Sequence, residues 1–271
     1  MMTRMIPVLF SLLLGLIIYP FQQSLAEDKP ADERKNRMEI STSYEHLSPH
    51  ADYGDWKTLS LGFYRKERPD LTWYTQLSHL SRPEGSGQLA AVGAFKDWSD
   101  SFYTYTSLSA GTESAYLPRT RVDNNFNFKF GPEKRLVGSV GGSYIQYFGD
   151  HKDYILSAGI MAYLKNSVAE YRIFRNQSDP GSVDSYSYLL SLSYGQDKHQ
   201  WTTATFSSGK QAYLATYLAT PQEVNQNSRM LTLNHRRWLG SEHGFFGDIS
   251  YVELENSYHK TGVSLGFFRE L

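Results

Sequence analysis

The chain has 271 residues, a formal net charge of -1 and no cysteine, and 15% of its residues are aromatic. The near-zero charge argues against a nucleic-acid partner, and the missing cysteines exclude disulfide and thiol chemistry. Mean hydropathy is -0.48, which argues against a helical membrane protein. A transmembrane β-barrel keeps such an average, because only every second residue faces lipid.

The N-terminal segment, residues 1–26, has the features of a secretory signal peptide. Arg4 precedes an apolar run from Ile6 to Tyr19, and small residues at Ser24 and Ala26 suit cleavage after Ala26. The alternative is a membrane anchor, but the run is shorter than the roughly 20 residues of a spanning helix. Residues 27–36 are charged, lack apolar periodicity and are expected to form a flexible periplasmic lead-in, or a short binding tail.

The remainder, residues 37–271, alternates between apolar and polar side chains with a period of two. This period is typical of strands that present one face to lipid and the other to a lumen. We expect an all-β fold, a transmembrane up-and-down antiparallel barrel of about fourteen strands, with twelve possible if one segment is wrongly divided. The segments lie near 37–46, 56–66, 70–80, 87–97, 100–112, 121–130, 136–148, 152–164, 168–176, 184–195, 200–209, 228–238, 245–255 and 258–268.

The segment 184–195 shows the alternation clearly, since tyrosines at both ends flank leucines on one face and serines occupy the other. Aromatic residues at both lipid interfaces with leucine between them are a barrel feature. The connections support the same interpretation. Short turns alternate with longer links at 47–55, 81–86, 113–120, 177–183 and 210–227. This parity predicts short periplasmic turns, long external loops and both chain ends in the periplasm.

A soluble β-sandwich is the main alternative to the barrel, because it also buries one face of each strand. Two features favour the barrel. The segments run for about ten residues where soluble strands average five or six, and the outward face is rich in Phe, Tyr and Leu throughout. The last segment, 258–268, is expected to close the barrel against 37–46, and Lys260, Gly262, Leu265 and Phe267 resemble the sorting signal of such barrels.

Several segments resemble the YaiO family of outer-membrane β-barrels. The resemblance rests on Gly142–Asp150, Ala169–Arg175 and Ser207–Tyr213, with Ser208 where the family often has arginine. It implies a barrel without a catalytic signature and a possible link to exopolysaccharide export. It also implies a Gram-negative outer membrane, with membrane lipid and the barrel-assembly machinery as partners. The C-terminal Arg269-Glu-Leu271 departs from barrels that end on phenylalanine.

Nothing in the sequence indicates catalysis, a cofactor or a metal. His235 and His259 are expected on the lipid face at an interface, and the loop histidines, His50 among them, lack metal-ligand spacing. An outer-membrane hydrolase would need a serine, histidine and acid cluster at one rim. We therefore expect a non-enzyme, and keep the hydrolase only as a third hypothesis.

Function is expected on the inner face, where polar, charged and aromatic residues gather. These side chains either pair and fill the interior or line a narrow, porin-like pore for a saccharide or other small polar solute. A non-conducting docking barrel of the envelope is the alternative, and loop 210–227 is either a constriction or an extension of two strands. The residues assigned inward are Glu39, Glu45, Tyr64, Lys66, Tyr74, Gln76, Lys96, Asp123, Asn125, Asn127, Lys129, Glu170, Arg172, Asn234, Arg236, Asp248 and Lys260.

Overall fold

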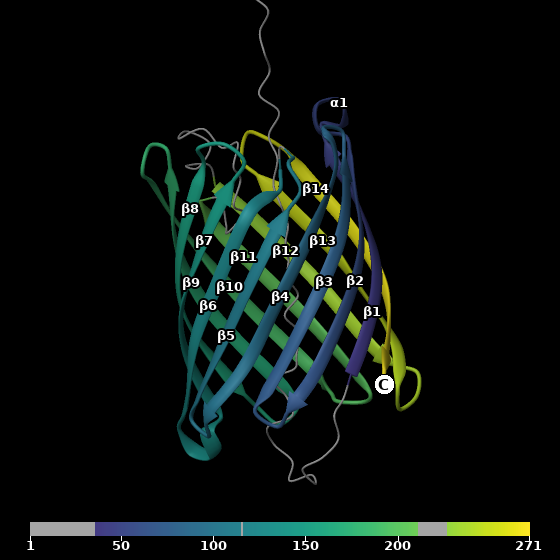
Figure 1. The fold of residues 1–271 in the computed structure, drawn as a ribbon, viewed down its shortest axis with the longest axis vertical. Coiled ribbons are helices and arrows are strands. Elements are labelled where there is room, and N and C mark those ends of the chain that lie inside the picture. Colours follow the sequence, from purple (N-terminus) through teal and green to yellow (C-terminus); the bar gives the residue numbers. More distant parts are fainter. Residues whose placement is uncertain (1–35, 115, 211–226) are drawn as a thin grey trace, which may run out of the picture.

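The computed structural model describes residues 36–114, 116–210 and 227–271, and these form one closed antiparallel sheet (Figure 1). Each strand pairs with its neighbours in sequence, and β14 pairs with β1, so the sheet has no free edge. The strands are β1 (Asn36–Ser48), β2 (Asp55–Arg68), β3 (Leu71–Arg82), β4 (Gly85–Ser99), β5 (Phe102–Gly111), β6 (Pro118–Phe130), β7 (Leu136–Tyr147), β8 (Lys152–Tyr163), β9 (Ser167–Asp179), β10 (Val183–Gln196), β11 (Gln200–Lys210), β12 (Asn227–Trp238), β13 (His243–Leu254) and β14 (His259–Glu270). The predicted barrel is confirmed, with fourteen strands and not twelve.

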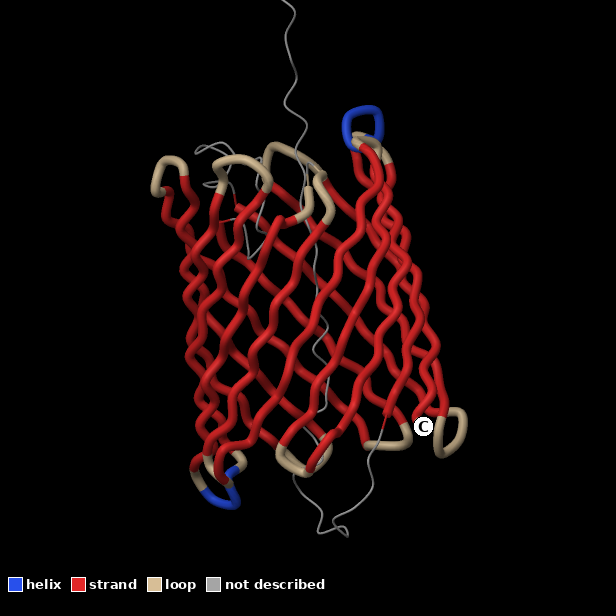
Figure 2. The backbone as a smooth tube through the Cα atoms, viewed as in Figure 1, coloured by secondary structure: helices blue, strands red, loops and turns tan. Residues whose placement is uncertain are grey.

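Two one-turn helical segments lie at opposite ends of the barrel (Figure 2). Helix α1 (His50–Tyr53) connects β1 to β2, and the 3-10 turn η2 (Pro132–Lys134) connects β6 to β7. Among the described residues, no helix is long and apolar enough to cross a membrane.

Both ends of the barrel domain lie at the same rim, where Asn36 and Leu271 exchange backbone hydrogen bonds of 3.2 and 2.8 Å. We call this rim the periplasmic end, following the orientation that the sequence predicts, and the opposite rim the external end. The links predicted at 81–86 and 177–183 are shorter in the structure. Strand β3 continues to Arg82 and β4 begins at Gly85, while β9 continues to Asp179 and β10 begins at Val183. Both connections are therefore tight turns.

The two faces of each strand separate as the period of two requires. On β10, Leu190 is 56% exposed on the outward face and its neighbour Ser191 is 6% exposed on the inward face. On β14, Leu265 and Phe267 point outward, whereas Lys260 and Gly262 point inward. The alternation therefore gives an apolar outer surface for lipid, while the sorting role of these four residues stays a prediction.

Several predictions fall outside the described residues. They are the signal peptide 1–26 with cleavage after Ala26, nearly all of the lead-in 27–36, and loop 210–227 between its first and last residues. Only their borders are described. Asn36 begins β1 and does not belong to the lead-in, Lys210 ends β11, and Asn227 begins β12.

Candidate functional site: the inner wall of the barrel

The side chains assigned to the inner face lie on the strand faces that point into the barrel, with one exception. Their positions follow from the burial pattern of each strand and from the cross-strand pairs, since paired residues share a face. The residues on the inward faces are Glu39, Glu45, Tyr64, Lys66, Tyr74, Gln76, Asp123, Asn125, Asn127, Lys129, Glu170, Arg172, Asn234, Arg236, Asp248 and Lys260.

Lys96 is the exception, and its predicted inward position is wrong. It pairs with Leu71 on the outward face of β3, and its inward neighbours on β4 are Phe95 and Asp97. The Lys96 ammonium pairs with Asp70 and lies 5.6 Å from the Trp98 ring centroid, at the periplasmic end. A shift of one residue in the assumed alternation moves a side chain to the other face of a sheet.

A buried ion-pair cluster joins β1 to β12 across the interior. Glu39 accepts hydrogen bonds at Oε1 from Arg236 Nη2 at 2.9 Å and pairs with Arg37 Nε at 2.8 Å. The Arg236 guanidinium also stacks on Phe246 and Phe268, with distances of 4.7 and 4.6 Å to their centroids. Such planar stacking suits arginine, which is more weakly hydrated than an ammonium group.

The opposite part of the wall also neutralises its charges in pairs. Arg121 donates to both oxygens of Asp123, and Arg172 Nη2 lies 3.0 Å from Glu170 Oε1. Lys129 Nζ lies 3.2 Å from Asp97 Oδ1. Each cation of these pairs faces a carboxylate at short distance, so these described residues present both signs of charge side by side.

An aromatic row crosses the inward faces of β2 to β5. The Tyr64 and Tyr74 rings stack at 5.7 Å, and the Tyr74 hydroxyl shares a 2.7 Å hydrogen bond with the Tyr105 hydroxyl. Phe95 continues the row, with its centroid 4.8 Å from that of Tyr105. The glycine at position 93 makes room for the Tyr74 ring, since a Cβ there would lie 2.5 Å from Tyr74 Cε1. We call Tyr64, Tyr74, Phe95 and Tyr105 the aromatic row.

The inward faces of β7, β8, β10 and β11 carry mostly small side chains, whereas β9 between them presents Glu170, Arg172 and Phe174. Hydroxyl pairs connect the strands, with Ser191 and Thr205 at 3.1 Å and Ser193 and Thr203 at 2.8 Å. We call this set the hydroxyl wall. Strand β8 stands seven places from β1 around the closed sheet, so the β7 and β8 part of the hydroxyl wall lies opposite the strand that carries Glu39. The wall consists of Ser139, Gly141, Ser143, Ser157, Gly159, Ser187, Ser191, Ser193, Thr203, Thr205 and Ser207.

An apolar cluster fills the external end on the β1 to β4 side. The Tyr116 hydroxyl donates to the carbonyl oxygens of Leu80 and Gly85 at 3.1 and 2.9 Å, and this folds the β5–β6 loop inward. Burial raises the pKa of the Tyr116 hydroxyl, which therefore stays neutral. Leu117 packs over Gly87, where a Cβ would lie 2.5 Å from its Cδ1. The external apolar cluster is Leu47, Trp56, Leu80, Leu89, Tyr116, Leu117, Leu254 and Tyr258.

Two buried cations pack against aromatic rings of this cluster. The Arg82 guanidinium is held between the Trp56 and Tyr116 rings, at 3.9 and 4.3 Å from their centroids. Lys260 is 0% exposed, donates to Glu45 Oε1 at 2.6 Å and lies 4.8 Å from the Trp56 centroid. Arg82 and Tyr116 are not among the residues predicted to face inward, although both lie in predicted links where a long side chain can turn inward.

The histidines do not form a hydrolase site among the described residues. His151 Nε2 lies 3.3 Å from Asp153 Oδ1, and Ser178 donates to that same carboxylate at 2.5 Å, so the acid stands between the two. Serine activation requires the histidine in the middle position. His235 and His259 lie on outward faces and contact Thr202 and Tyr251, respectively.

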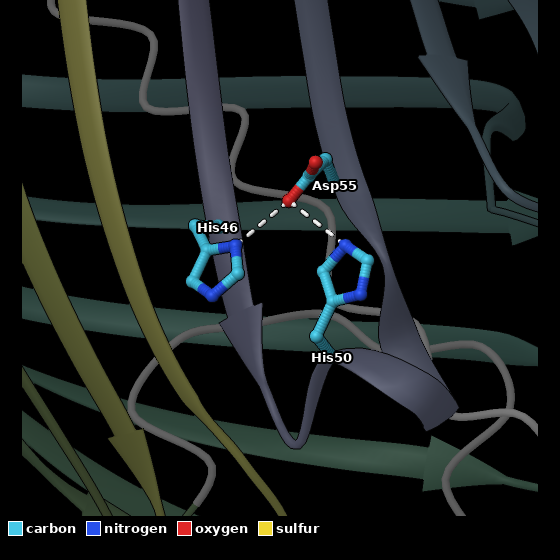
Figure 3. A group of neighbouring side chains, drawn as sticks. All are labelled: His46, His50 and Asp55. Atoms are coloured by element: carbon cyan, nitrogen blue, oxygen red, sulfur yellow. Dashed lines mark hydrogen bonds and ion pairs between the residues drawn. The ribbon is translucent and has the colours of Figure 1, made fainter.

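The sequence indicates no metal-ligand partners for His50, and the fold brings it together with His46 and Asp55 at the external rim (Figure 3). The nitrogen and oxygen donors of the three side chains all lie within 4.8 Å of one another.

The barrel is similar to solved outer-membrane structures. These include a bacterial polysaccharide outer membrane secretin (TM-score 0.53, 9% identity, 90% of this chain and 100% of that chain covered). They also include Acinetobacter baumannii Omp33 (0.53, 9%, 87% and 98%) and an anion-selective porin from Comamonas acidovorans (0.50, 9%, 88% and 99%). At such low identity the likeness shows the fold alone.

A comparison with curated proteins gives no match. The family model described as the YaiO membrane beta barrel domain matches residues 35–214, which is more than half of the chain. The predicted resemblance is thereby confirmed, and an outer-membrane location follows for the barrel. The chain belongs to the YaiO family of membrane β-barrels.

Proposed function

We propose that this barrel is a narrow passage through the outer membrane for a small uncharged polar solute of the saccharide class. One observation carries the proposal: the aromatic row lies on β2 to β5, the hydroxyl wall lies on β7, β8, β10 and β11, and the ion pairs of Arg121 with Asp123 and of Arg236 with Glu39 lie between them. Aromatic faces and hydroxyl groups are the partners that a sugar needs for stacking and hydrogen bonding.

The charge arrangement supports an uncharged solute. Selectivity for ions arises from rings of like-charged side chains at a constriction, whereas Arg121 with Asp123 and Arg172 with Glu170 cancel locally. The strand number supports a narrow passage. About eight strands leave an interior that side chains fill, and 16–18 strands leave an open channel, so fourteen lies between these limits.

Planar-bilayer recording with the purified barrel tests this proposal. Open-channel current that a series of neutral oligosaccharides reduces in a concentration-dependent way is the expected result. Ser191→Tyr adds bulk to the hydroxyl wall and is expected to lower the conductance. Leu190→Tyr places the same side chain on the lipid face of the same strand and is the matched control, expected to leave it unchanged. A wild-type barrel with no current and no sugar block would refute the passage.

A non-conducting docking barrel is the second candidate, and the external apolar cluster favours it. Tyr116 and Leu117 are buried in this cluster of apolar side chains at the external end. The link to exopolysaccharide export that the family resemblance implied belongs to this candidate as well. Absence of conductance together with recovery of a defined envelope or polysaccharide-export partner in a pull-down would favour docking over passage.

A further inference from the structure

The hairpin at the external end brings two histidines and an aspartate to one spot on the outer face. His46 and Asp55 stand directly opposite each other in the β1–β2 register, and both belong to the outward alternation of their strands. His50, the first residue of α1, approaches from the loop above them (Figure 3). The three side chains therefore lie on the outer rim, away from the lumen and from the passage proposed above.

Two imidazole rings converge on a single carboxylate oxygen. His46 Nδ1 lies 2.8 Å and His50 Nε2 lies 3.5 Å from Asp55 Oδ1. The two rings stack with centroids 5.2 Å apart and an interplanar angle of 16°. One histidine is enough to form a surface ion pair with Asp55. The second imidazole, His50, at 3.5 Å from the same oxygen, is the feature that indicates a shared ligand.

The loop that carries His50 is fixed in place by its backbone. Gly54 ends α1 at φ +61°, in a region that residues with a side chain rarely adopt. A Cβ at this position would lie 2.4 Å from Cγ of Pro83 in the β3–β4 turn. Gly54 thus lets the hairpin close against the neighbouring turn. A loop held in this way presents its ligands with little rearrangement, as metal binding favours.

We propose that His46, His50 and Asp55 form a binding site for one divalent transition-metal ion of the Zn²⁺ and Cu²⁺ class. Two imidazole nitrogens and one carboxylate oxygen suit these borderline ions, whereas Ca²⁺ and Mg²⁺ prefer oxygen ligands throughout. Ligand bonds of about 2.0–2.2 Å place donors roughly 3.3 Å apart in a tetrahedral site. The donor atoms all lie within 4.8 Å of one another, so binding one ion requires them to approach by up to about 1.5 Å. Three protein ligands leave a coordination position for water or an external ligand.

The test uses the full mature barrel without a histidine tag, folded in detergent or lipid vesicles. Zn²⁺ titration calorimetry measures stoichiometry and affinity, and Cu²⁺ electron paramagnetic resonance counts coordinated nitrogens. One ion per chain and two imidazole nitrogens are expected. Removal of a residue that only hydrogen-bonds to a metal ligand lowers metal affinity about 10–100-fold. Because His46 and His50 would be ligands themselves, His46→Ala and His50→Ala are each expected to lower the Zn²⁺ affinity at least tenfold. Both substitutions are on exposed side chains, so folding, followed by heat-modifiable gel mobility, is expected to persist.

His79→Ala is the matched control, because His79 is exposed on the outward face of the neighbouring strand β3. It is expected to leave affinity, stoichiometry and the nitrogen signal unchanged. Wild-type affinity in a His46→Ala/His50→Ala double variant overturns the proposal. An equal loss in the His79→Ala variant also overturns it, because binding would then be spread over surface histidines. The passage proposal is tested separately by conductance, which these rim variants leave intact.

Discussion

Replacement of Lys260 by methionine is expected to destabilise the barrel strongly. The Lys260 side chain is 0% exposed and its partner Glu45 is 15% exposed, with 2.6 Å between Nζ and Oε1. Methionine fills the space of the lysine stem against Trp56 but removes the charge, so the largely buried Glu45 carboxylate loses its ion-pair partner and keeps only its attraction to Arg82. Loss of one partner from a buried ion pair costs about 3–5 kcal/mol. Because Glu45 retains some contact with solvent, we expect about 3 kcal/mol.

Reversible urea unfolding in lipid vesicles, followed by tryptophan fluorescence, measures this change in the free energy of unfolding. The double variant Lys260→Met/Glu45→Gln is expected to be more stable than Lys260→Met alone, since no uncompensated carboxylate remains. Lys198→Met is the matched control, because Lys198 pairs with Glu270 at the periplasmic rim and its side chain is 47% exposed. Exposed pairs contribute up to about 1 kcal/mol. A Lys260→Met loss no larger than that of the control would refute the reasoning.

Two further changes probe the aromatic row and the external end. Gly93→Ala places a Cβ 2.5 Å from Tyr74 and is expected to lower the free energy of unfolding by about 1–3 kcal/mol through overpacking. Gly138→Ala is the control, because the nearest atom to its Cβ would lie at 3.5 Å. Equal free energies of unfolding for the two variants would contradict the close contact at Gly93. Tyr116→Ala releases the loop from Leu80 and is expected to raise single-channel conductance in planar bilayers, and an unchanged current would show that this side does not limit passage.

The strand faces were predictable because each strand separates water from lipid. On β10, Leu190 and Ser191 differ so strongly in polarity that the face of every residue on the strand follows. The error at Lys96 has the opposite cause. The stretch 87–97 places small or apolar residues on both faces, so the period of two has no contrast to reveal which residues point inward. The structure assigns the face from pairing with β3 instead.

The external end was not predictable in the same way, because its contacts join loops that no period describes. Tyr116 reaches Leu80 across 36 positions, and the inward fold of its loop depends on glycine at position 87. The His46, His50 and Asp55 group depends on hairpin register. His46 lies opposite Asp55 because of the register in which β1 and β2 pair. That register depends on the strand boundaries at the turn, which the hydrophobic pattern locates poorly.

The pairing of β1 with β14 has a consequence for how the molecule is made. Its two partners are the first and the last strands of the chain, joined from Arg37 with Glu270 to Ser48 with His259. Until β14 pairs with β1, both strands expose unpaired backbone groups, which are templates for pairing with other chains. Closure of the barrel depends on the two strands farthest apart in the sequence, and pairing over such a separation is intrinsically slow. A chain truncated before His259 is left with two permanent edges and is expected to aggregate.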